Sequence, residues 1–202
     1  MKRTFCLIAL LLFSMAVAPA QTNRPAAITQ IDRYVRSVDR FVANKKNRKI
    51  VVADVAGQSN GKPKWRRFAS ENELEKFREN SETYTIAFNW KRGGRVVASN
   101  FTLFSESGDW AQYVDHYFRP DGTAALIKSE LRTFYGDYIV IDIQYFDTRG
   151  RLIRKRSKYL DLVTNKPKKP TDEMRNENSG FFRGTIYKRV SKLPFARLLG
   201  GN

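Results

Sequence analysis

The sequence predicts an α+β fold, in which an N-terminal amphipathic helix and a short second helix pack on a curved antiparallel β-meander of about six to eight strands. Three observations lead to this prediction. Apolar residues recur at helical spacing before residue 44. From residue 83 onward, β-branched and aromatic runs alternate with glycine-containing turns. A hairpin signature also recurs every 28 residues. A chain of 202 residues fits one such domain.

Two segments carry helix signals. In 26–44, apolar residues spaced by three and four share one helical face: Ile28, Ile31, Val35, Val38, Phe41 and Val42. Asp32 and Asp39 fall largely on the other faces, so this helix should pack on a sheet. The second helix follows "SENELEKFRE" (70–79), where Ser70 and Glu73 form a capping box. Between the two helices, "KIVVADVA" (49–56) predicts a strand.

The meander is predicted from six further runs with strand composition, joined by short turns. They are 83–90, 95–105, 110–118, 123–135, 138–146 and 151–162. Because consecutive strands joined by short turns are antiparallel neighbours, alternate turns should lie at the same end of the sheet.

The repeat supports this arrangement. Its three glycines, each preceded four residues earlier by an aromatic residue, are Gly94, Gly122 and Gly150. Two apolar sets follow the glycines at three and nine residues: Val97, Ala125 and Ile153, then Leu103, Leu131 and Tyr159. The offset of six between the sets predicts that both lie on one face of the sheet. A repeat of this kind indicates packing rather than catalysis, with glycine allowing the positive φ of the turn.

The two ends of the chain differ in character from the middle. Residues 1–20 have the basic start, apolar run and small-residue end of a secretory signal peptide, so we expect export to the periplasm or the medium after cleavage near Ala20. Residues 21–163 form the predicted domain, and 164–180 read as a polar linker or loop. Residues 181–202 predict a last strand, 181–190, and an apolar tail docked on the same domain.

The sequence offers little for catalysis. Cys6, the only cysteine, lies in the signal segment, so the mature chain has no disulfide and no thiol nucleophile. The only histidine, His116, follows Asp115 on a predicted strand, and neighbouring strand residues point to opposite faces. Three turn acids, Glu106, Asp109 and Asp137, could act as general acid and base or hold calcium. No nucleophile elbow, phosphate loop, EF-hand or other cofactor motif is present, so no metal or cofactor is predicted.

Positive charge is the more informative feature. The formal net charge is +17, or +15 once Lys2 and Arg3 leave with the signal. Basic residues gather at the glycine turns and along "RLIRKRSK" (151–158). The predicted anion-binding residues are Arg92, Arg95, Arg119, Lys128, Arg149, Arg151, Arg154, Arg156 and Lys158. An anionic envelope surface or extracellular polymer is a better match for an exported protein than nucleic acid, which would favour exposed aromatics such as Trp65 among the charges.

These observations favour a non-enzymatic binding or interaction protein that uses its basic sheet face and turn end. Two alternatives remain open. One is a periplasmic carrier that holds an apolar or amphipathic ligand between sheet and helix, in a cavity of several hundred cubic ångströms lined by Trp90 and Phe118. The other is a small hydrolase or lyase that uses His116 or the turn carboxylates. After removal of the signal, no segment of the sequence is apolar enough to span a membrane.

Overall fold

The computed structural model describes residues 24–56, 62–172, 174–175 and 185–200. The predicted signal peptide, including Cys6, and the predicted strand residues 181–184 lie outside the described residues. The described residues contain two α-helices and eight strands, and the sheet is fully antiparallel in the order β2-β1-β3-β4-β5-β6-β7-β8. Neither α1 nor any other helix in the described ranges is long and apolar enough to cross a membrane.

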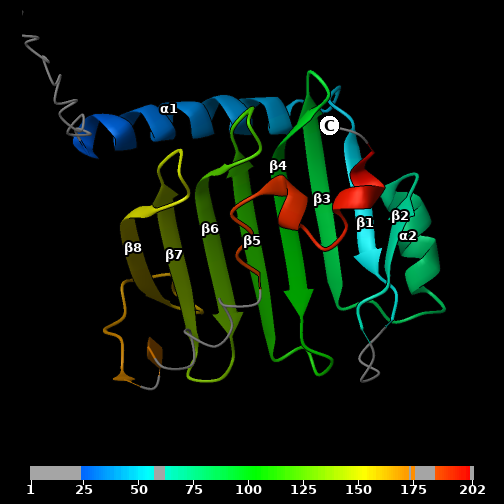
Figure 1. The fold of residues 1–202 in the computed structure, drawn as a ribbon. Helices are drawn as coiled ribbons and strands as arrows, with labels where there is room; N and C mark the ends of the chain where they lie inside the picture. Colours follow the sequence, from blue (N-terminus) through cyan, green and yellow to red (C-terminus); the bar gives the residue numbers. More distant parts are fainter. Residues whose placement is uncertain (1–23, 57–61, 173, 176–184, 201–202) are drawn as a thin grey trace, which may run out of the picture.

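Six strands follow one another as a meander (Figure 1). They are β3 (Thr85–Arg92), β4 (Arg95–Phe104), β5 (Trp110–Phe118), β6 (Ala124–Thr133), β7 (Tyr138–Phe146) and β8 (Leu152–Asp161). The α+β meander predicted from the sequence is therefore confirmed. Two more strands extend the sheet beyond β3: β1 (Lys49–Asp54) and β2 (Trp65–Phe68). Sequence reasoning missed β2, which has only four residues.

Both helices pack on one face of the sheet, called here the helix face. Helix α1 (Arg24–Ala43) crosses the sheet near the end that carries the glycine turns, and its buried residues Ile28, Ile31 and Val38 contact β4 to β7 (Figure 1). Helix α2 (Glu71–Arg78) packs beside β1 and β2 through Leu74. The Ser70 hydroxyl accepts the backbone N–H of Glu73 at 3.2 Å, as the capping signal predicts.

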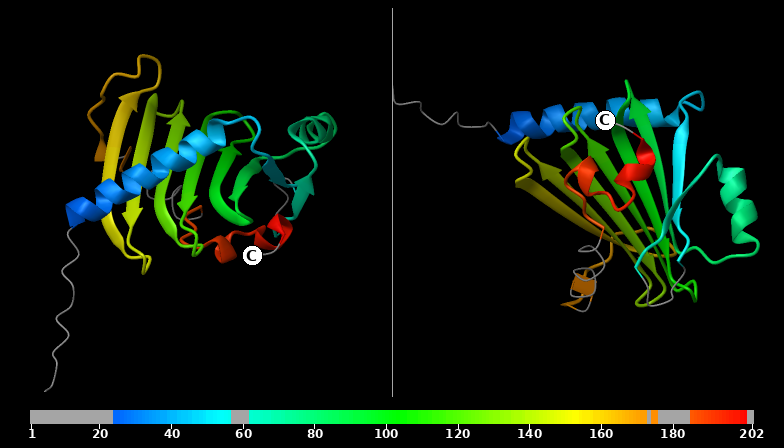
Figure 2. Two further views of the ribbon diagram at one scale, coloured as in Figure 1. Left: turned by 90° about the horizontal axis from the view of Figure 1, so that it is seen from above. Right: turned by 45° about the vertical axis from the view of Figure 1, so that its right-hand side comes forward.

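Residues 185–200, called here the strap, cover the opposite face, called the strap face (Figure 2). The strap joins the sheet through the Ala124 N–H, which donates to the Lys188 carbonyl at 2.9 Å, and forms an isolated bridge between Thr123 and Arg189. Two 3-10 turns follow, η1 (Val190–Lys192) and η2 (Ala196–Leu199). The described part of the segment predicted as a last strand thus contributes a single bridge, while the apolar tail beyond it is docked on the sheet.

The sheet curls towards the strap at its β2 end. Trp65 and Phe101 lie on strands three steps apart, which is about 14 Å in a flat sheet. Their ring centroids are only 6.2 Å apart, and Phe195 of the strap lies 4.6 Å from Trp65. At this end the curvature encloses the strap, where Trp65, Phe101 and Phe195 pack together.

The repeated hairpins contain a repeated β-bulge, which corrects one prediction. Register shifts fall after Trp90, Tyr117 and Tyr145, leaving one unpaired residue on the following strand in each hairpin: Val97, Ala125 and Ile153. These residues pack towards α1, whereas the second predicted set, Leu103, Leu131 and Tyr159, lies on the strap face. The prediction that both sets share a face is wrong, because a bulge changes which side of the strand the following residues occupy.

If the strap is part of the core, Phe195→Ala should lower the free energy of unfolding by about 3 to 5 kcal/mol. Phe195 is 1% exposed and contacts both Trp65 and Phe101. Denaturant unfolding measures the effect, with the exposed neighbour Arg197→Ala as the matched control, expected to change stability by less than about 0.5 kcal/mol. Equal small effects of both substitutions would contradict the docking of the strap.

Candidate functional site

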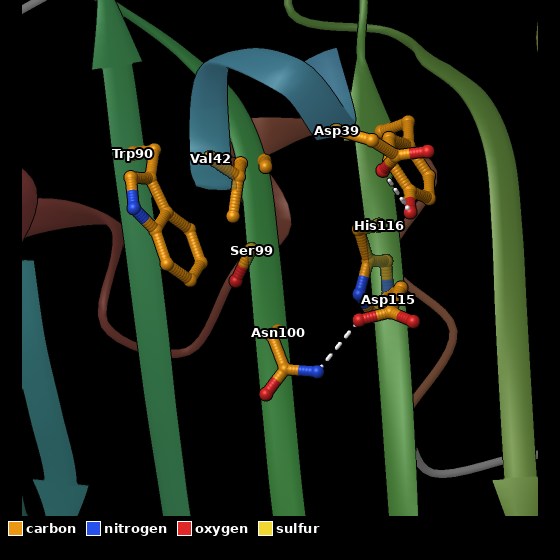
Figure 3. A pocket seen from close by; sticks show the side chains of 9 residues that line it. Asp39, Val42, Trp90, Ser99, Asn100, Asp115 and His116 are labelled. Carbon is orange, nitrogen blue, oxygen red and sulfur yellow. Dashed lines mark hydrogen bonds between the residues drawn. The ribbon is translucent and has the colours of Figure 1, made fainter. Parts of the chain in front are cut away.

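A small pocket lies on the helix face beneath the C-terminal half of α1 (Figure 3). Asp39 and Val42 of α1 lie on one side, Trp90 of β3 forms another wall, and β4 and β5 form the floor. The cavity volume is about 180 Å³. Ligand pockets usually measure about 300 Å³ or more, so this space suits a few atoms rather than a carried apolar ligand. Phe118, the other predicted cavity residue, is fully buried on the strap face.

Both carboxylates of this pocket are already engaged, although the buried Ser99 hydroxyl has no hydrogen-bond partner in the described part of the chain. The Tyr117 hydroxyl donates to Oδ1 of Asp39 at 2.8 Å, and Nδ2 of Asn100 donates to Oδ1 of Asp115 at 2.6 Å. Burial raises the pKa of Asp115, partly offset by the hydrogen bond from Asn100. Burial and the nearby carboxylates also raise the pKa of Tyr117. Both carboxylates thus serve as acceptors for neighbouring side chains, which explains the polar lining in structural terms.

His116 lies on the strap face, away from Asp115, as strand alternation predicts. It is 1% exposed and stacks on Phe118 with centroids 5.8 Å apart. Its Nε2 accepts the backbone N–H of Tyr187, in the strap, at 3.2 Å. Burial lowers the pKa of His116 to about 4, so the ring is neutral near pH 7. This geometry gives His116 the role of a strap anchor, since the covered ring cannot reach a substrate in solution.

Two of the three turn carboxylates, Asp109 and Asp137, line one open pocket of about 430 Å³, and Glu106 is not among its lining residues. Oδ2 of Asp109 accepts the Ser107 hydroxyl at 2.6 Å, and Glu106 accepts the Tyr84 hydroxyl at 3.4 Å. Asp137 has a positive φ of 50° and uses its carbonyl oxygen to accept the Leu162 N–H. Within the described ranges, no group of three or more Asp, Glu, His or Cys residues could hold a metal ion.

Four of the nine predicted anion-binding residues have structural roles. The Arg119 guanidinium donates to the carbonyls of Ala124 and Phe146, each at 2.6 Å, and burial lowers its pKa. Arg92 donates to the Ser37 carbonyl at 2.8 Å and lies over the Phe41 ring. The other two make ion pairs: Lys128 with Glu130 at 3.5 Å and Arg151 with Asp147 at 2.7 Å.

The other five are solvent-exposed, and their side chains make no hydrogen bond or ion pair with the described part of the chain: Arg95, Arg149, Arg154, Arg156 and Lys158. The last three alternate along β8, the strand at one edge of the sheet, and lie on the helix face. We call Arg154, Arg156 and Lys158 the cationic ladder. Alternate strand residues are about 7 Å apart, so the ladder places three unpaired charges in a line of about 14 Å.

Sequence reasoning missed two features that shape the site. Tyr117 and Tyr145 precede the repeated Phe118 and Phe146, and each hydroxyl donates to a carboxylate of α1, the second to Oδ1 of Asp32 at 2.9 Å. The repetition of tyrosine before phenylalanine was the available signal. Reasoning also missed the pairing of Lys155 with Asp142 at 2.9 Å on the strap face, which depends on strand register.

Comparisons with known proteins add no functional information. The chain matches no known protein family, no curated protein and no solved structure at a significant level. The functional argument therefore depends on the geometry alone.

The buried histidine predicts a pH dependence of stability. In the unfolded chain His116 takes up a proton near its ordinary pKa of 6.5, but in the folded protein only near 4, so stability falls as pH drops from 6.5 to about 4. The loss from this residue is about 3 kcal/mol over that window. Denaturant unfolding near pH 7 and near pH 4 should show a steeper decline for the wild type than for His116→Phe. Equal declines would contradict the assignment of a buried neutral ring.

Proposed function

We propose that the protein is exported and acts as a non-enzymatic binding protein that holds a linear anionic polymer along β8. The single observation that supports this function is the cationic ladder: Arg154, Arg156 and Lys158 are exposed, alternate on one face of an edge strand, and have no acidic partner in the described part of the chain. A line of fixed charges fits a polymer that carries regularly repeated charges better than it fits a single small anion.

The acids of the neighbouring strands leave the ladder's charge in place. Glu130 on β6 lies between Lys128 and Arg132, at 3.5 and 2.7 Å, and is neutralised by them. Asp142 on β7 points to the strap face and pairs with Lys155. Surface charges attract an anion only when their own protein does not already compensate them, so this arrangement leaves β8 as a positive stripe.

The alternative functions receive less support from the geometry. The space between α1 and the sheet is smaller than a carrier of an apolar ligand requires. Asp109 and Asp137 share a pocket, but Asp109 already accepts the Ser107 hydroxyl, and His116 is covered by the strap and is not among the residues of that pocket.

Neutralising the ladder should weaken binding of polyphosphate by at least about tenfold, since three exposed charge contacts are lost. The variant is Arg154→Gln, Arg156→Gln, Lys158→Gln, and the measurement is fluorescence anisotropy with labelled polyphosphate at several salt concentrations. The slope of log affinity against log salt should fall by about 2, because fewer counterions are released.

The matched control removes the same charge elsewhere: Lys45→Gln, Lys46→Gln, Arg48→Gln, all exposed in the loop after α1. It should keep the wild-type salt slope. If both triple variants lose affinity equally, binding reflects net charge and the proposed site is wrong.

Export has its own test. The mature protein recovered from the expressing cell should begin at Gln21 by intact mass and N-terminal sequencing. Recovery of a chain that keeps residues 1–20 in the cytoplasm would contradict the proposed export.

A further inference from the structure

The outer edge of β8 is covered along only part of its length. Its inner edge pairs with β7 from Asp161 to Leu152. On the outer side, the Asp161 N–H donates to the Lys166 carbonyl and the Lys168 N–H donates to the Tyr159 carbonyl, both at 2.9 Å. Residues 166–168 therefore act as a short ninth segment of the sheet, joined by a bridge between Leu160 and Pro167. This cover ends at Tyr159.

The backbone groups of Ser157 and Lys155 point outward in the same way. Backbone N–H and C=O groups of alternate strand residues face the same edge, and the register of β8 is regular from Arg154 to Asp161. The groups of Tyr159 and Asp161 face outward, so those of Ser157 and Lys155 do too. Within the described ranges, no backbone hydrogen bond satisfies this outer edge of residues 155 and 157. Unpaired edge groups of this kind are a template for a further strand.

The charges on β8 indicate which kind of strand could pair with its open outer edge. Arg154, Arg156 and Lys158 project on the helix face, and Lys155 on the strap face, so positive side chains flank both sides of the open edge. A second copy of the chain would bring the same charges against themselves, which opposes self-pairing. A strand with acidic side chains would instead meet cations on the helix face, with backbone hydrogen bonds to fix its register.

We propose that the outer edge of β8, residues 154–158, binds an extended acidic segment of a partner protein as an added β-strand. This inference rests on the proposed function and names its partner class: the anionic polymer is a polypeptide, held both by the cationic ladder and by the outward backbone groups of Lys155 and Ser157. The occupant is an extended stretch with Glu or Asp at alternate positions. A polyanion without peptide groups, such as polyphosphate, can use the ladder alone.

The experiment separates the backbone contribution from the charge. The probe is a labelled synthetic peptide of alternating glutamate and valine, with polyphosphate as the second probe. Ser157→Pro removes one outward N–H, and proline is tolerated on an edge strand where its nitrogen faces solvent. Ser157→Ala, which keeps the N–H, is the matched control. Ser157→Pro should weaken peptide binding at least about tenfold and leave polyphosphate binding unchanged, while Ser157→Ala should bind both probes like the wild type.

The possible outcomes separate strand addition from the proposed function, which is polyanion binding by the cationic ladder. If Ser157→Pro binds the peptide as well as Ser157→Ala does, or if the wild type binds polyphosphate but not the peptide, strand addition is overturned and the polyanion site stands. Unchanged binding of both probes by the triple ladder variant would instead remove the proposed function. The competing explanation, that edge cations serve only to prevent aggregation, predicts no peptide binding that depends on the Ser157 N–H.

Hydrogen exchange provides a second measurement that does not depend on the folding of a proline variant. In the wild type, the amide hydrogens of Lys155 and Ser157 should exchange at least about tenfold more slowly when the peptide is bound, and at an unchanged rate with polyphosphate. Absence of this peptide-specific protection would overturn strand addition.

Discussion

Two tyrosine–aspartate hydrogen bonds set the position of α1 on the sheet, and the rest of the architecture depends on them. The acceptors, Asp32 and Asp39, are seven residues apart, or about 10.5 Å along a helix. The donors, Tyr117 and Tyr145, occupy strands two apart in the sheet, which are separated by about 9.6 Å. Helix rise and strand spacing therefore agree, so a single helix placement satisfies both bonds. The small pocket at Asp39 is a consequence of this placement.

The hairpin repeat makes this match possible because its second and third copies each present a tyrosine and a phenylalanine to opposite faces. Tyr117 reaches α1, while Phe118 enters the core beneath the strap. The bulge opposite this pair adds a residue that also packs on α1, Ala125 in this hairpin. Gly122, with φ of 77°, closes the turn between them. The bulged hairpin thus packs on α1 on one face and under the strap on the other. This double packing role explains why the hairpin recurs better than a recognition role does.

The fold could be predicted where the signals are local. The strand runs, glycine turns and Ser70 cap depend on neighbours in sequence, and all six predicted meander strands begin and end within two residues of the observed bounds. The bulge at Val97 could not be predicted, because it is a property of pairing between two strands. For the site, alternation alone placed Arg156 and Lys158 on one face. Whether a basic side chain has a partner depends on which carbonyls and carboxylates the fold brings near it. The sequence therefore could not predict that Arg156 and Lys158 are unpaired or that Arg119 is half-buried.

The contrast between Arg119 and Arg154 shows why net charge alone does not define a binding surface. Arg119, in the turn after β5, donates two short hydrogen bonds to backbone carbonyls and is half-buried. The Arg154 side chain, on β8, is exposed and makes no hydrogen bond or ion pair with the described part of the chain. On β8 the cations accumulate where the backbone edge is also open. Charged side chains on an edge strand can protect it from pairing with other chains. Four of the five residues from Arg154 to Lys158 are cations, and three of them lack an ion-pair partner in the described part of the chain. Recognition of an acidic strand uses both the cations of β8 and its unpaired backbone edge. It therefore explains why the two features occur together, whereas protection against aggregation explains only the cations.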